Sequence, residues 1–223
     1  MPSTFASSRL VRLLAGWTPL ETEPPGMDMA ERLSLWVNAF DAIGLQAANQ
    51  VTPAPPMAAL AASSAPVARR VWAQPVDEDL QQVRAALAGA IERAIDGSNP
   101  AETAYAVYRQ RHLELQRQME QAIGPLRERV RDALTRGSPA QRKLAALDAV
   151  FEHVIAPREQ TLLRMVPAVL QRRFEQLRQE DPEGWLAPFA RDWRQALAAE
   201  LELRLEPVAG LIEAGSNELK KRP

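Results

Sequence analysis

Cysteine is absent from the 223 residues of this chain, which excludes disulfide bonds, thiolate nucleophiles and cysteine-ligated zinc or iron–sulfur sites. Histidine occurs only at His112 and His153, and neither stands in a His-Glu-x-x-His or Glu-x-x-His pattern, so helical zinc and di-iron sites lack their usual ligands. Glycine-rich phosphate-binding loops and the Gly-x-Ser-x-Gly motif are missing too. We expect no catalytic residue, no metal and no cofactor, and we assign both histidines to packing or hydrogen bonding.

Long apolar runs are also lacking, because no stretch approaches the roughly 18 residues that a membrane-spanning helix needs. Arg12 interrupts the apolar stretch Leu10–Ala15 near the N-terminus, which makes that stretch a poor signal peptide. The formal net charge of −1 gives no overall attraction to nucleic acid or to an anionic membrane. We therefore expect a cytoplasmic protein without membrane insertion.

Alternating β-branched residues between tight turns are not found, so the sequence predicts no strands. Apolar residues instead recur at steps of three and four, the spacing of one helix face. This pattern predicts an all-α fold, a helical bundle built on a long, proline-kinked antiparallel helical hairpin. The seam of the first arm comprises Tyr105, Tyr108, His112, Leu115, Met119, Ile123, Leu126, Val130 and Leu134. The apolar positions of the second arm include Val150, Phe151, Val154, Leu162, Met165, Val166, Leu170 and Phe174.

Two sequence signals mark the starts of the hairpin arms, Asn99-Pro100-Ala101-Glu102 and Ser138-Pro139-Ala140-Gln141. Each combines a capping side chain, a proline at the first helical position and Glu or Gln at the third. Arg136-Gly137 joins the arms, and Pro157 and Pro167 interrupt the second arm. Because an interior proline removes a backbone hydrogen bond, we expect breaks or bends there.

The same spacing predicts a short N-terminal helix that ends near Gly16. It also predicts three further helices, at residues 29–49, 77–95 and 189–212. Pro207 should bend or divide the last of these, and Gly215-Ser216-Asn217 should end it. Five prolines lie among alanines and serines between residues 50 and 76. We expect an N-terminal helical segment at 1–50, an Ala/Pro-rich flexible linker at 51–76 and the main helical bundle at 77–223.

Arginines gather near the predicted hairpin turn, where Arg129, Arg136 and Arg142 are candidate contacts for an anion such as the phosphate backbone of a nucleic acid. Acidic residues interleave with them, and Asp132 with Arg136 forms a natural i,i+4 pair. Arginine outnumbers lysine 24 to 3 in the whole chain, so an arginine at a given position carries little information. Nucleic-acid binding is therefore the alternative hypothesis.

The leading hypothesis is a non-enzymatic helical interaction or scaffold protein. A bent second arm would leave part of the long seam of the first arm uncovered, and an exposed apolar stripe needs another helix. We predict a homodimer or a helical protein partner, with Tyr108, Leu115 and Met119 as the partner contacts.

Several stretches resemble an uncharacterised proteobacterial family, the domain of unknown function 3348. They include Ala30-Glu31-Arg32-Leu33-Ser34-Leu35-Trp36, Tyr108-Arg109, Ala156-Pro157-Arg158-Glu159, Val166-Pro167-Ala168, Arg172-Arg173-Phe174 and Ala199-Glu200-Leu201-Glu202-Leu203-Arg204-Leu205. The resemblance covers nearly the whole chain except the expected linker. It implies no catalytic residue, cofactor or substrate, and it points to coiled-coil or envelope-associated proteins as partners.

Overall fold

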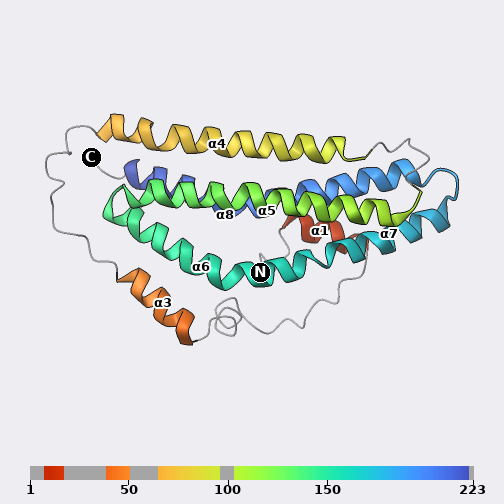
Figure 1. Cartoon of the computed structure of the whole chain (residues 1–223), viewed down its shortest axis with the longest axis horizontal. Coiled ribbons are helices and arrows are strands. Elements are labelled where there is room, and N and C mark those ends of the chain that lie inside the picture. The colour runs from red at the N-terminus through yellow and green to blue at the C-terminus, as the bar shows by residue number, and fades with distance from the viewer. Residues whose placement is uncertain (1–7, 18–38, 51–64, 96–102, 221–223) are drawn as a thin grey trace. The chain divides into compact units, whose positions relative to one another are not determined.

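The computed structural model describes residues 8–17, 39–50, 65–95 and 103–220, and these are almost entirely helical (Figure 1). The helices are α1 (Arg9–Ala15), α3 (Ala39–Asn49), α4 (Ala65–Arg93), α5 (Tyr105–Thr135), α6 (Pro139–Leu163), α7 (Val166–Glu180) and α8 (Leu186–Lys220). No strand occurs within the described ranges. The prediction of an all-α helical bundle is confirmed.

The contacts among the helices divide the chain into two compact units, each built from separate segments. Unit 1 combines α1 with Gln82–Ile123 and Gln160–Glu206, and it therefore holds all of α7. Unit 2 combines α3 with α4 up to Gln81, with Gly124–Glu159, and with α8 from Pro207 onward. The long helices α4, α5, α6 and α8 each contribute to both units.

The expected linker at 51–76 needs correction in its second half. Residues 51–64 lie outside the described residues, but the chain is helical from Ala65, so the expected helix start at Asp77 is wrong. Pro66 stands in the first turn of α4, where its missing N–H is not needed. Pro75 removes one internal hydrogen bond without ending the helix. The division into segments 1–50, 51–76 and 77–223 otherwise stays a prediction.

Several predicted helix ends can be compared with the described residues. α1 ends at Ala15 with Gly16 as its C-cap, as predicted. The Asn99 capping signal and the start of the predicted 29–49 helix lie outside the described residues, and α5 begins at Tyr105. The expected end of α8 at Gly215 is wrong, because α8 continues to Lys220. Gly215 is buried, and its carbonyl accepts a hydrogen bond of 2.9 Å from Gln141 Nε2. This hydrogen bond joins the end of α8 to the start of α6.

The turn between α5 and α6 carries the predicted capping box. The backbone N–H of Gln141 donates to the Ser138 hydroxyl at 3.2 Å, and the Ser138 N–H donates to Gln141 Oε1 at 2.8 Å. Gly137 is needed beside this box, because an added Cβ would lie 2.0 Å from Gln141 Oε1. That oxygen cannot move away without losing its hydrogen bond, so the turn favours glycine for steric reasons.

The predicted seams form most of the core. On α5, eight of the nine seam residues are buried and Tyr105 is half-buried. On α8, all seven residues of the predicted apolar face are buried: Phe189, Trp193, Leu197, Leu201, Leu205, Val208 and Ile212. In unit 1 the aromatic rings pack edge to face, with centroids 4.8 Å apart for Tyr108 and Phe189 and 4.7 Å apart for Phe174 and Trp185.

Candidate interaction site at the junction of α6 and α7

Only one of the two prolines in the second hairpin arm breaks the helix. α6 continues through Pro157 to Leu163, whereas α7 begins at Val166 with Pro167 in its first turn. Pro167 has no N–H, so it cannot donate the helical hydrogen bond that the carbonyl four residues earlier, on Leu163, would normally accept. We refer to residues 162–167 as the junction.

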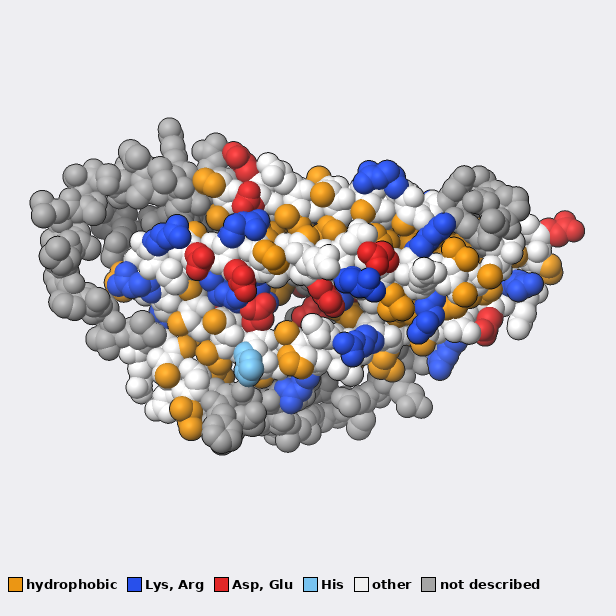
Figure 2. All heavy atoms as spheres, in the orientation of Figure 1, with side chains coloured by type: hydrophobic (Ala, Val, Ile, Leu, Met, Phe, Trp, Pro, Cys, Tyr) orange, Lys and Arg blue, Asp and Glu red, His pale blue; other side chains and the backbone are white. Residues whose placement is uncertain are grey.

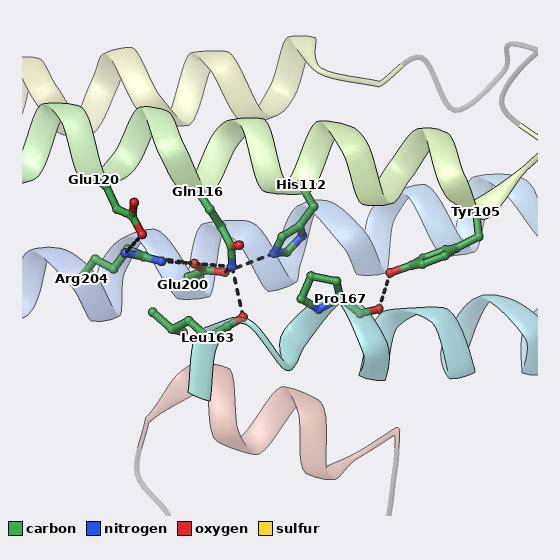
Figure 3. Close-up of polar contacts among 8 residues, drawn as sticks. All are labelled: Tyr105, His112, Gln116, Glu120, Leu163, Pro167, Glu200 and Arg204. Atoms are coloured by element: carbon green, nitrogen blue, oxygen red, sulfur yellow. Dashed lines mark hydrogen bonds and ion pairs between the residues drawn. The ribbon is translucent and has the colours of Figure 1, made fainter. Parts of the chain in front are cut away.

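Gln116 of α5 replaces the hydrogen bond that Pro167 removes. Its Nε2 donates to the Leu163 carbonyl at 3.2 Å, and Gln116 is buried (Figure 3). A second contact follows one turn further, where the Tyr105 hydroxyl donates to the Pro167 carbonyl. Burial raises the pKa of Tyr105, so its hydroxyl remains a donor at neutral pH. Two side chains of α5 therefore fix the backbone of the junction.

The same glutamine joins the junction to a buried polar cluster between α5 and α8. Gln116 Nε2 lies 2.9 Å from Oε1 of Glu200, and Arg204 donates to the same oxygen at 2.9 Å. His112 Nε2 lies 3.3 Å from Oε2 of Glu200, and both side chains are fully buried. Arg204 also lies 3.7 Å from the exposed Glu120 (Figure 3).

The electrostatics of the cluster favour the ionised form of Glu200. Burial alone would raise its pKa, but the hydrogen bond and charge of His112 and the charge of Arg204 outweigh that effect and hold the pKa of Glu200 below its ordinary value. His112 and Glu200 have no exposed surface, and their contact joins α5 to α8 inside unit 1.

Two apolar side chains of the junction point outward. Leu162 is 64% exposed and Met165 is 61% exposed, although Leu163 and Val166 beside them are buried. Residues 160–174 contain three arginines and no acidic residue. Figure 2 shows basic and hydrophobic side chains beside one another over this part of the chain. The junction thus presents two exposed apolar side chains in a stretch that also carries the exposed Arg164 and Arg172, with Glu159 and Glu175 just outside it.

Helix α1 lies beside the junction (Figures 1 and 3). The guanidinium carbon of Arg173 in α7 lies 5.9 Å from the ring centre of Trp17, which follows α1. Arg173 also binds Asp192 of α8 at 2.9 Å. Residues 160–174 contain three arginines. Arg173 makes its contacts within unit 1, whereas Arg164 and Arg172 are exposed.

The predicted partner contacts Tyr108, Leu115 and Met119 are core residues in the structure. Their exposed fractions are 0%, 4% and 0%, so they cannot contact a partner in this conformation, and the prediction is wrong for them. Helices of the same chain cover the seam that we expected to be partly open. The sequence pattern places Leu162 and Met165 on the apolar face of the second arm, but in the structure both are exposed. They leave that face because the helix breaks just before Pro167.

The three candidate anion contacts do not form one cluster of like charge. Arg129 pairs with Asp79 at 3.2 Å, and Arg142 donates to the Gly137 carbonyl at 2.8 Å, while Arg136 is exposed. Two arginines of the same stretch, Arg127 and Arg131, form an ion network within unit 2. Arg127 binds Asp148 at 2.5 Å, and Arg131 binds both Asp148 and Glu152.

The described ranges contain no group of three His, Asp or Glu side chains placed to hold a metal ion. They also contain no helix that is long and apolar enough to cross a bilayer.

Comparison with known proteins identifies a family. The family described as "Protein of unknown function (DUF3348)" matches residues 1–217. The chain belongs to this family. No curated protein and no solved structure matches the chain. The family resemblance predicted from the sequence is therefore confirmed, and membership assigns no activity to any residue.

Proposed function

We propose that this DUF3348 protein is a non-enzymatic helical interaction or scaffold protein that binds a partner protein at the junction of α6 and α7. The observation that carries the proposal is the exposure of Leu162 and Met165 on a backbone that Gln116 and Tyr105 hold in place. A surface fixed before binding loses little conformational entropy when a partner docks, which favours recognition.

The chemistry of the junction favours an acidic amphipathic helix as the partner segment. Apolar residues on such a helix would cover Leu162 and Met165, and its carboxylates would face Arg164 and Arg172. Residues 160–174 carry no acidic side chain that would repel those carboxylates. Complementary charge of this kind orients the partner helix on the surface and raises the rate at which the two proteins associate. A helical segment on a coiled-coil or envelope-associated protein would meet these requirements.

A binding titration tests the proposal with two defined probes. The first is a fluorescent acidic helical peptide with leucines at positions a and d, and the second is a scrambled peptide of the same composition. We expect saturable binding of the first alone, and about tenfold weaker binding after Leu162→Ser with Met165→Ser, because the apolar contact is lost. Phe151→Ser is the matched control, since Phe151 is an exposed apolar residue of unit 2.

Two outcomes would contradict the proposal. One is the absence of saturable binding of the helical peptide, and the other is binding that both variants weaken equally. The alternative function, binding of nucleic acid through arginines near the hairpin turn, is tested with duplex DNA in the same assay. Salt-sensitive DNA binding that is lost on Arg136→Ala would support that alternative.

A further inference from the structure

Helix α1 packs on unit 1 through one apolar face and turns its charged residues outward. Leu10 is buried, while Leu13 and Leu14 are half-buried. Because residues three and four positions apart share a helix face, these leucines form the face that packs on the unit. The remaining residues of α1 are exposed: Arg9, Val11, Arg12 and Ala15. The outer face of α1 is therefore basic and carries no acidic residue.

The fold brings this basic face next to a second segment without acidic residues. α1 lies beside the junction and the first turns of α7 (Figures 1 and 3), and the guanidinium of Arg173 in α7 lies over the ring of Trp17. Residues 8–17 contain two arginines and residues 160–174 contain three, with no aspartate or glutamate in either segment. Both segments belong to unit 1, although they lie far apart in the sequence.

Among the described residues, only one of these five arginines has its charge compensated by an ion pair. Arg173 pairs with Asp192 at 2.9 Å. The other four are exposed and form no ion pair within the described ranges: Arg9, Arg12, Arg164 and Arg172. The next acidic residue after the second segment, Glu175, accepts a hydrogen bond from Gln171 at 3.0 Å. Exposed like charges on a folded surface produce a positive potential that attracts carboxylates.

We propose that α1 completes the junction site, and that the acidic helix of the partner protein spans both α1 and the junction. Its carboxylates pair with the arginines of α1 as well as with Arg164 and Arg172. Val11, which is 40% exposed, adds to the apolar contact of Leu162 and Met165. This inference rests on the proposed function, because it extends the same site. It adds the requirement that the partner segment carries enough carboxylates to face four arginines rather than two.

An anionic membrane surface would meet the same charges, but the packing of α1 favours a protein partner. Helices that bind membrane surfaces insert their apolar face among the lipids. In α1 that face packs on unit 1, and Leu10 is only 3% exposed. The outer face of α1 therefore offers a single larger apolar side chain, Val11, which is too little for insertion.

Binding of the fluorescent acidic helical peptide to charge-reversed full-length chains tests the inference. We expect Arg9→Glu with Arg12→Glu to weaken binding about tenfold and to reduce its dependence on salt, because two attractive contacts become repulsive. Arg178→Glu with Arg191→Glu is the matched control, since both arginines are exposed in unit 1 outside the two segments. The control should bind the peptide within about twofold of the wild type.

A photoreactive side chain at Val11 gives a second measurement that does not depend on charge reversal. It should form an adduct with the bound peptide, whereas the same group at Gln110, exposed on α5, should not. Equal peptide binding by the two double variants, or no adduct at position 11, would overturn the contribution of α1 and leave the proposed function standing.

Two further outcomes concern the partner. The absence of saturable peptide binding to the wild type would contradict the proposed function itself and overturn this inference with it. Binding of phosphatidylglycerol vesicles that is lost with Arg9→Glu and Arg12→Glu, while peptide binding is unchanged, would overturn the protein partner at α1 in favour of a membrane surface.

Discussion

Leu115→Asp should lower the free energy of unfolding by about 4 kcal/mol or more, because it removes apolar packing and buries an unpaired carboxylate. Leu115 is 4% exposed on the seam of α5, between His112 and Met119, which are both fully buried. Chemical denaturation followed by circular dichroism measures the change.

Gln110→Asp is the control for this substitution. Gln110 is exposed on the same helix, so the same change of charge there should alter stability by less than about 1 kcal/mol. Equal stability of the wild type and the Leu115→Asp variant would show that Leu115 faces solvent. That result would contradict the packing of α5 described above.

Glu200→Ala should lower the free energy of unfolding by about 3–5 kcal/mol, because removing one member of a buried ion pair leaves its partners without compensation. Arg204 and Gln116 would lose their acceptor, and His112 would lose the carboxylate that lies 3.3 Å from its Nε2. Glu202→Ala is the control, since Glu202 forms a partly exposed pair with Arg84 at 3.2 Å, and such pairs contribute about 1 kcal/mol or less.

The same residue predicts a pH dependence of stability. The folded state holds the pKa of Glu200 below the value in the unfolded chain, so the unfolded chain binds a proton first as the pH falls. The stabilisation from Glu200 is complete above the unfolded pKa of about 4.3 and is lost as the pH falls towards and through the folded pKa. Denaturation curves from about pH 6, above the unfolded pKa, to about pH 3, below it, should show a smaller loss of stability for Glu200→Gln than for the wild type. An identical loss in both proteins would contradict the role assigned to this carboxylate.

Much of the fold follows from local patterns in the sequence. The three- and four-residue steps of α5 and α8 identify buried positions correctly, because each helix keeps one face towards the core along its length. The Ser138 to Gln141 capping box is also local, and its two hydrogen bonds form as predicted. Prolines are harder to interpret, since Pro75, Pro157 and Pro207 stay inside helices while Pro167 ends one.

The candidate site depends on contacts that local patterns do not contain. Gln116 and Glu200 are separated by 84 positions in the sequence. Both are polar, so the spacing of apolar residues gives no sign that they are buried together. Leu162 and Met165 belong to two adjacent apolar pairs, and the break at the junction exposes one member of each pair while Leu163 and Val166 stay buried. After such a break the next helix can turn a different set of residues towards the core. The spacing of apolar residues alone therefore could not predict that Leu162 and Met165 are exposed.

Site-specific photo-cross-linking tests most directly whether the junction binds a helical segment of a partner protein. A photoreactive side chain is placed at Met165 in the native host, and Gln110, exposed on α5, serves as the control position. We predict a discrete protein adduct at position 165 alone, with the cross-linked segment of the partner carrying apolar residues at helical spacing flanked by carboxylates. No adduct at position 165, or the same adducts at both positions, would contradict the claim.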